Sequence, residues 1–324
     1  MSLGNQYLTN ITADQYQGLL ERIVMSTLTT VPCFVFLFIN GVMLFTLRSK
    51  AVFRETSRYV LLFNLLLADT LQMAMCQILY LLSTGRMTLT YTVCGLLLIV
   101  AILTNEISPL TLVVMCLERY VAVCYPLRHS TIITTRNTAV AVIVVWAVGS
   151  LHILARVILM LEFPFEELES LQMKDLCSDK MLFRGPKSDV YDKVHTCLLF
   201  VGAGVAVSCS YIGVMIAARS ASTDKASIRK ARKTLLLHLM QLGLSLSSTI
   251  FNPLLIHLST ILTRIEFVRM TNVLYVCIFL FPRCLSSLIY GIRDQTIRPV
   301  FMYHLCCRLK LSVVRAKAQV DFVK

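Results

Sequence analysis

The sequence predicts an all-α membrane protein, namely a seven-transmembrane helix bundle with a short amphipathic cytoplasmic helix after the last span. Of the 324 residues, 56% are hydrophobic and only 15% are charged, which is unusual for a soluble domain. A bilayer core about 30 Å thick needs about 20 apolar residues for each helix that crosses it. Runs of this length occur at 23–47, 59–83, 91–123, 137–161, 192–218, 234–262 and 268–292. None of them alternates in the way that a strand of a membrane β-barrel does.

The distribution of basic residues orients the bundle. With the N-terminus outside, the inner segments hold about twenty basic residues against five acidic ones, whereas the outer segments hold about nine and eleven. Because short cytoplasmic loops collect Lys and Arg, we expect a multi-pass protein of the plasma membrane with an extracellular N-terminus and a cytoplasmic C-terminus. This asymmetry accounts for the net charge of +13, and it favours membrane lipid and a cytosolic protein as partners over nucleic acid.

The chain divides into an extracellular N-terminus at 1–22, a seven-helix domain at 23–292, and an amphipathic helix with a cytoplasmic tail at 293–324. The first segment lacks the basic region and apolar core of a cleaved signal peptide, so the first span is expected to act as the insertion signal. Asn10-Ile11-Thr12 is a glycosylation sequon on the side predicted to be extracellular. Although sequons also arise by chance, this placement predicts a glycan on Asn10.

Two features mark the spans in the middle of the chain. The third span ends in the triplet Glu118-Arg119-Tyr120. An ion pair at the membrane face is costly to place and easy to break, which suits a switch.

The fifth span is the weakest of the seven, because Ser208 and Ser210 dilute its apolar character.

The chain has twelve cysteines, a number that could indicate a disulfide framework, but their positions on the predicted helices argue against one. Most lie inside spans, where a buried Cys is simply a small apolar residue. Cys94, at the outer end of the third span, and Cys177, in the long second outer loop, face the oxidising side. They allow one pairing, which would hold the acidic loop over the bundle, and the alternative is two free thiols.

The stretch after the last span is predicted to be an amphipathic helix on the inner leaflet. One face recurs there at helical spacing and is mostly apolar, with Ile292, Thr296, Ile297, Val300, Phe301, His304 and Leu305. Arg293, Arg298 and Arg308 lie alongside it. Cys306 and Cys307 lie beside the membrane and are candidates for palmitoylation; the alternative is that they stay reduced and unmodified.

Marked residues stand at fixed places in these helices. Asn40 and Asp69 lie in the middle of the first and second spans, Cys94 precedes Arg119 by twenty-five residues, Trp146 lies in the fourth span, and Tyr290 closes the seventh. With Glu118-Arg119-Tyr120 they resemble the rhodopsin-like (class A) G-protein-coupled receptors over residues 23–308. The resemblance implies coupling to a heterotrimeric G protein, with arrestin as a further candidate partner.

Longer stretches are similar to odorant receptors of the kind abundant in fishes. These stretches are Met115–Arg128, Ser210-Tyr211-Ile212, Lys230–His238 and Pro282–Asp294. The resemblance implies an odorant receptor that binds a small organic ligand between its helices and activates a stimulatory, olfactory-type G protein. The alternative within the class is a non-olfactory receptor for a peptide or a lipid, since the acidic second outer loop would suit a basic peptide.

The resemblance assigns a switch to the inner end of the bundle. In the inactive state Arg119 would pair with Glu118, and on activation it would turn towards Tyr211 and an inserted helix of the G protein. Tyr120 and Tyr290 complete this predicted group.

The chain departs from the family pattern in the last two spans. Ser286-Ser287 replaces the usual Asn-Pro, so the proline kink is expected at Pro282. Phe251-Asn252-Pro253 replaces the Cys-Trp-x-Pro of the sixth span. Phe251 is then either a side-chain toggle or a plain core aromatic residue.

An internal polar site is predicted around Asp69. In comparable receptors this residue helps to hold a sodium ion, and Ser108 is a further ligand. Arg283 lies one helical turn before Ser287 on the face of the last span that should meet Asp69, so we expect Arg283 to supply a tethered cation instead. Asn40 and Ser286 complete the site. The alternative is that Arg283 faces a polar gap or the inner surface.

The ligand cavity is expected between the third, fifth, sixth and seventh spans, towards the outside. Its predicted lining residues are Ala101, Ile102, Asn105, Glu106, Phe251, Asn252 and Tyr275, and His195 and His257 are either further contacts or solvated residues of helix ends. Ala101 stands where amine receptors carry Asp, which argues against an amine ligand. Glu106, paired with His152 or Arg156 of the fourth span, would either orient a ligand or join two helices.

Other functional classes fit the sequence less well. A transporter would show two repeated halves with broken helices, and a channel would show a filter loop or a charged ring. No P-loop, catalytic triad or histidine–glutamate metal cluster is evident in the sequence, so we expect neither an enzyme nor a cofactor.

Overall fold

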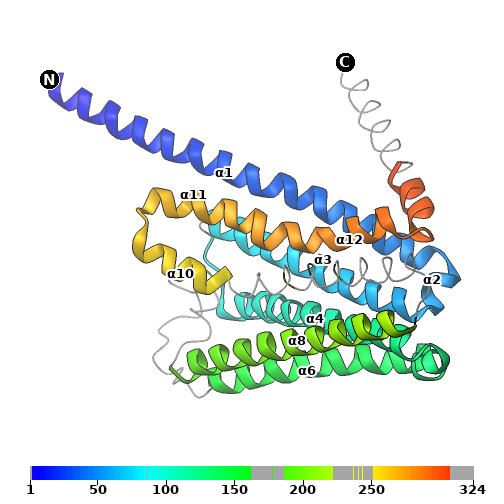
Figure 1. Cartoon of the computed structure of the whole chain (residues 1–324). Coiled ribbons are helices and arrows are strands. Elements are labelled where there is room, and N and C mark those ends of the chain that lie inside the picture. The colour runs from blue at the N-terminus through cyan, green and yellow to red at the C-terminus, as the bar shows by residue number, and fades with distance from the viewer. Residues whose placement is uncertain are drawn as a thin grey trace.

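The computed structural model describes residues 2–85, 87–161, 177, 186–221, 236, 240, 243 and 251–306, with the backbone alone for some helical positions. Helices make up almost all of this part of the chain and lie side by side in a bundle (Figure 1). The elements are α1 (Ser2–Ser49), α2 (Ala51–Glu55), α3 (Ser57–Thr84), α4 (Tyr91–Cys124), η1 (Pro126–Arg128), α5 (His129–Ile132), α6 (Thr135–Leu161), α8 (Pro186–Ala221), α10 (Phe251–Ile261), α11 (Arg264–Leu274), η4 (Tyr275–Leu280) and α12 (Phe281–Arg293), followed by a helix at 297–306.

Six of these segments are long and apolar enough to cross a membrane, counting only the described residues. They are Ile23–Ser49, Ser57–Thr84, Tyr91–Cys124, Thr135–Leu161, Pro186–Ile216 and Arg269–Arg293. They correspond to the first five predicted spans and to the seventh. The predicted sixth span at 234–262 lies mostly outside the described residues, and α10 covers its last part. The N-terminal segment 1–22 continues the first helix, since α1 begins at Ser2.

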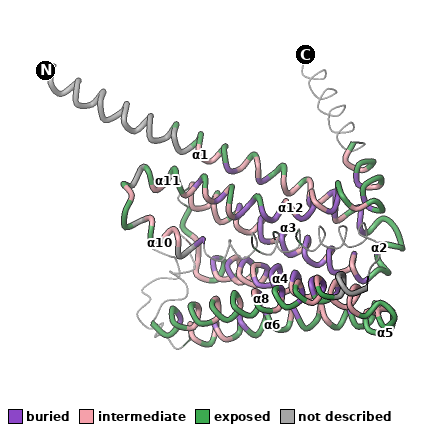
Figure 2. The backbone as a smooth tube through the Cα atoms, in the orientation of Figure 1, coloured by how far each residue is buried: buried purple, intermediate pink, exposed green. Residues whose placement is uncertain are grey.

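The surface of the bundle has the polarity of a membrane protein. Large apolar side chains such as Leu151 and Leu154 on α6 and Leu198 on α8 are more than half exposed. Figure 2 shows exposed residues along the outer sides of α6 and α8, while the buried ones face the centre of the bundle. Asp69 and Arg283, by contrast, are buried. Apolar residues outside and charges inside are expected where hydrocarbon replaces water as the solvent.

The last span is interrupted by a short π-helix. η4 covers Tyr275–Leu280, and α12 follows with Pro282 in its first turn. π-Bulges and proline are both known causes of helix irregularity. The π-helical segment ends at Leu280, two residues before Pro282, where the proline kink is expected. Tyr275 and Phe279 both lie in the π-helical turn and are buried.

The helix at 297–306 is anchored by Asp294. Oδ1 of this residue accepts hydrogen bonds from the backbone N–H groups of Thr296 (2.9 Å) and Ile297 (3.2 Å), as an N-cap does. Ile297 is fully buried against the bundle and Arg298 is exposed, which agrees with the predicted amphipathic helix. Ile292 differs from the prediction, because it ends up exposed on α12.

Candidate functional site

One end of the bundle carries Arg119 and is called the Arg119 end; the other carries Cys94 and is called the Cys94 end. At the Arg119 end, Nε of Arg119 lies 3.1 Å from Oε2 of Glu118, and both side chains are largely buried near the C-terminal end of α4. His129 Nε2 lies 3.9 Å from the other oxygen of Glu118. Among the described residues, Nη2 of Arg119 is buried without a hydrogen-bond partner. The guanidinium therefore retains a donor for a further acceptor.

The next residue, Tyr120, packs against α8. The ring lies so close to Gly213 that a Cβ atom at that position would overlap it, with Cδ2 of the tyrosine 3.0 Å away. Gly213 thus permits the close approach of α4 and α8 at the Arg119 end. Tyr211 lies two residues before this glycine and is half-buried, and Tyr290 of α12 is buried beneath the guanidinium of Arg58, 5.7 Å from its ring centre.

In the middle of the bundle Arg283 reaches Asp69, as the helical spacing predicted. Arg283 Nη1 lies 3.1 Å from Asp69 Oδ1, and both side chains are about 5% exposed. Ser108 donates a hydrogen bond of 2.6 Å to the same oxygen, and Arg283 Nη2 donates one of 2.8 Å to Asn105. The guanidinium also lies 4.7 Å from the centre of the Phe279 ring. The alternative that Arg283 faces the inner surface is excluded by this geometry.

The other two predicted members of the internal polar site are also buried. Asn40 of α1 accepts a 2.5 Å hydrogen bond from Ser287 of α12. Ser286, the predicted member, is buried too, and the neighbouring residue Ser287 is the one that makes this bond to α1. A helical residue and its neighbour point about 100° apart, so the sequence alone could not decide between the two serines.

A second polar group was missed in the sequence. Trp146 Nε1 donates a 2.8 Å hydrogen bond to Asn64, and Asn64 in turn donates one of 2.9 Å to Thr111. This chain joins α6, α3 and α4 through neutral side chains. Charged residues are rare in membrane spans and stand out there, whereas neutral amides and hydroxyls do not.

An aromatic cluster connects α10 with the last span. Phe251 packs against Tyr275 (ring centres 6.4 Å apart) and Phe279 (6.1 Å), while Tyr275 stacks on Tyr80 of α3 (5.7 Å). Phe251 is 9% exposed, which is consistent with either of its predicted roles. The side chain of Asn252 lies outside the described residues.

Nearer the Cys94 end, Glu106 meets two histidines. Its carboxylate, His152 of α6 and His195 of α8 present ligand atoms that all lie within 4.8 Å of one another. No such cluster is evident in the sequence, because the three residues come from three different helices, and it is the fold that brings them together. Arg156, a predicted partner of Glu106, forms a 2.8 Å ion pair with Asp192 and also acts electrostatically on Glu106.

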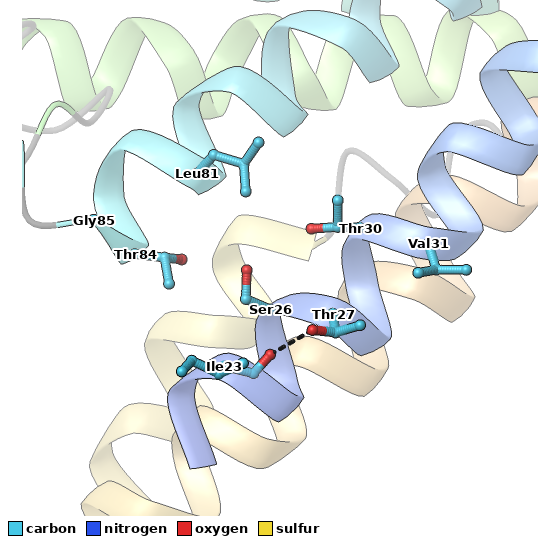
Figure 3. A pocket seen from close by; sticks show the side chains of 8 residues that line it. All are labelled: Ile23, Ser26, Thr27, Thr30, Val31, Leu81, Thr84 and Gly85. Carbon is cyan, nitrogen blue, oxygen red and sulfur yellow. Dashed lines mark hydrogen bonds between the residues drawn. The ribbon is translucent and has the colours of Figure 1, made fainter. Parts of the chain in front are cut away.

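The remaining predicted lining residues have different surroundings. Ala101 is buried in α4, Ile102 packs against the cluster of Cys94 and Leu98, and His257 is exposed on α10. Cys94 and Cys177 form the predicted disulfide. A cavity of about 510 Å³ lies between α1 and α3. Its lining residues, drawn in Figure 3, are Ile23, Ser26, Thr27, Thr30, Val31, Leu81, Thr84 and Gly85. This cavity lies apart from the predicted ligand site. The predicted ligand site also involves the sixth span, much of which lies outside the described residues.

Comparison with known proteins identifies the family. The model of the 7 transmembrane receptor (rhodopsin family) matches residues 39–290. Odorant receptor 131-2 of Danio rerio is 31% identical over 274 residues, which cover 84% of this chain and 83% of that receptor. Olfactory receptor 2A5 of Homo sapiens is 27% identical over 224 residues, or 66% and 68% of the two chains. Olfactory receptor 1500 of Rattus norvegicus is 26% identical over 129 residues, or 40% of each.

The family match runs from the first predicted span to the last and includes the sixth. It confirms the prediction of a seven-helix membrane bundle and of a receptor that is not an enzyme. Membership also implies coupling to a G protein and a small-molecule ligand. The chain belongs to the rhodopsin family of seven-transmembrane receptors.

Proposed function

We propose that this receptor is an odorant receptor of the plasma membrane that binds a small organic ligand and activates a stimulatory, olfactory-type G protein. The main support is the similarity to odorant receptor 131-2, which extends over five-sixths of both chains. The Arg119 end is then cytoplasmic, in agreement with the excess of basic residues predicted for that side. Arrestin remains a candidate partner at the same surface.

The observation that carries the mechanism is the buried pair of Glu118 and Arg119, only 3.1 Å apart. The pair represents the inactive state, because both charges are satisfied by each other near the low-dielectric bilayer. Activation breaks it, and Arg119 turns towards Tyr211 and the inserted helix of the G protein. The hydrogen-bonding capacity left on Nη2 of Arg119 supports this change of partner. Tyr290, buried at the same end, completes the group.

Arg283 acts as a tethered cation in place of sodium. The guanidinium and Ser108 both bind Asp69, so two positions around the carboxylate are filled by the protein itself. Arg283 also binds Asn105, and the next residue of α4 is Glu106 on the side that faces α8. A ligand that displaces α4 at these positions would disturb the Asp69–Arg283 pair as well. This is the route by which we connect the ligand cavity to Arg119.

Modification sites follow from the proposed orientation. Asn10 would carry a glycan on the extracellular side, and its side chain lies outside the described residues. Cys306 is exposed at the end of the helix at 297–306 and is positioned for palmitoylation. Cys307, the second candidate, lies outside the described residues.

The function is tested by measuring cyclic AMP in cells that express the chain with a stimulatory olfactory-type G protein. Odorants, amino acids and bile-type steroids are applied, and surface display is measured with an antibody. We expect a ligand-dependent rise that Arg119→Ala abolishes at unchanged surface level. A well-displayed receptor that signals only through a different G protein would refute the stimulatory assignment, and an equal response of Arg119→Ala would refute the switch.

A further inference from the structure

Three residues that bind metals in other proteins meet inside the bundle. Glu106 comes from α4, His152 from α6 and His195 from α8, and their ligand atoms lie within 4.8 Å of one another. Glu106 Oε2 and His195 Nε2 are 3.9 Å apart, and the two imidazole rings stack with their centres separated by 3.7 Å. Glu106 and His152 are buried, and His195 is partly exposed. The cluster is thus internal, with one side open.

The backbone brings these side chains together through a small residue. Gly149 lies one helical turn before His152, and a Cβ there would sit 3.0 Å from Leu103, 3.2 Å from Ile107 and 3.9 Å from Glu106. The absence of a side chain lets α6 approach α4 closely beside the carboxylate. The proximity of His152 to Glu106 therefore follows from helix packing.

We propose that Glu106, His152 and His195 form a binding site for a divalent transition-metal ion, best suited to Zn²⁺. Two imidazoles and one carboxylate are a common ligand set for zinc, and they leave a fourth position for water or for a donor atom of a small molecule. In a tetrahedral site with bonds of 2.0–2.1 Å the ligand atoms are about 3.3 Å apart. Separations of up to 4.8 Å must therefore shorten by up to about 1.5 Å. The two rings must also turn out of their stacked arrangement, because the lone pairs of stacked rings lie in parallel planes.

The surroundings of the cluster resemble the outer shell of a metal site. Tyr191 OH lies 3.3 Å from Nδ1 of His152. If Nδ1 carries the proton and donates to this oxygen, the lone pair on Nε2 is left for a metal ion. Tyr191 is four residues before His195 on α8, so the same helix supplies both a ligand and an orienting group.

The charges near the cluster favour a bound cation. Arg156 lies one helical turn from His152, and its guanidinium is paired with Asp192 at 2.8 Å. Arg156 also acts electrostatically on Glu106, so one guanidinium faces the two carboxylates of Asp192 and Glu106. With both imidazoles neutral, these three groups carry one more negative than positive charge, and a divalent ion held by the imidazoles would supply positive charge there.

The site is tested on the purified full-length receptor in lipid nanodiscs after treatment with a chelator. Zinc chloride is titrated while thermal unfolding is followed, and cobalt chloride is added separately to record the visible absorption of bound Co²⁺. We expect zinc to raise the Tm of the wild type and Co²⁺ to give a visible band. His195→Ala, which removes a partly exposed ligand, should abolish both signals. Tyr191→Phe should weaken zinc binding about 10-fold, as loss of an outer-shell partner does.

The matched control is His257→Ala, which removes an exposed histidine from α10 and should leave both signals intact. Equal zinc stabilisation of wild type and His195→Ala would overturn the proposal, because binding would then occur elsewhere. A wild type that shows neither a Tm shift nor a Co²⁺ band would also overturn it. The readouts need neither ligand nor G protein, so the result is independent of whether the odorant assignment holds.

Discussion

Replacing Arg283 with methionine tests the internal ion pair directly. Methionine keeps much of the volume of the side chain but removes the charge that faces Asp69. Asp69 would then lie among buried residues with Ser108 as its remaining described partner at 2.6 Å. A buried carboxylate that loses its counter-ion must either bind another cation or take up a proton. The variant should therefore be less stable and more dependent on the ions in the buffer.

The geometry gives the size of the effect. At the observed separation of 3.1 Å, two unit charges attract by about 5 kcal/mol at an effective dielectric constant of about 20. Removing one partner of a buried pair typically costs about 3–5 kcal/mol. The hydrogen bond from Arg283 to Asn105 is lost as well, and a bond to a charged group contributes about 1.5–3 kcal/mol. We expect the Tm of Arg283→Met to fall by about 5 °C or more.

The assay compares the Tm of the purified receptor in sodium chloride and in choline chloride. Wild type should unfold at the same temperature in both salts, whereas Arg283→Met should be stabilised by sodium, which can occupy the position of the guanidinium. Adding Asp69→Asn to this variant should recover part of the loss, since the unpaired carboxylate is then removed. Arg293→Met, at the exposed end of the same helix, is the matched control.

Two results would refute the reasoning. A wild type whose Tm rises with sodium would mean that Asp69 binds the ion despite Arg283. An Arg283→Met variant as stable as the wild type in both salts would mean that the pair does not hold the helices together.

Three further predictions concern other parts of the chain. Glu118→Gln should raise basal cyclic AMP at unchanged surface level, because it removes the charge that holds the switch, and a basal level equal to wild type would contradict this. Gly213→Val should reduce ligand-induced cyclic AMP and lower the Tm, since a larger side chain collides with Tyr120; unchanged signalling and Tm would show that α8 can move aside. Hydrogen bonds from Thr263 lower the pKa of Glu266 below its ordinary value of 4.5. This stabilisation is present above the unfolded-state pKa and is lost as the pH falls through the folded-state pKa, so the Tm difference between wild type and Glu266→Ala should shrink from about pH 6 to about pH 3.

The spans and the Asp69–Arg283 pair could be predicted because each rests on a short-range rule. Span positions follow from the length of an apolar run, and one helical turn sets the face on which Arg283 lies. Because a buried carboxylate needs a counter-charge, Asp69 was the expected partner of Arg283 inside the membrane. The same rule does not distinguish between two adjacent residues, so it could not decide between Ser286 and Ser287.

The full cluster of Glu106, His152 and His195 could not be predicted, because the place of His195 depends on where α8 begins and how it is rotated. The fifth span was expected to begin near 192, which put His195 close to a helix end. Instead α8 begins at Pro186, a residue suited to the first turn, and His195 lies well inside the helix. Asp192 and His195 are then three residues apart on one face, where they meet Arg156 and Glu106. The predicted meeting of Glu106 with His152 is thus observed, and Asp192 and His195 of α8 add partners that were not predicted.

Helix α4 is the element on which these groups converge, and its sequence explains why. Cys94 ties one end to Cys177, while Glu118 and Arg119 close the other end. Between them, Asn105 contacts the last span and Glu106 contacts α8, although the two residues are consecutive. A helix moves largely as a rigid body, so a shift that improves one of these contacts must alter the other. Events at the histidines and at the internal ion pair are therefore expected to be coupled through α4.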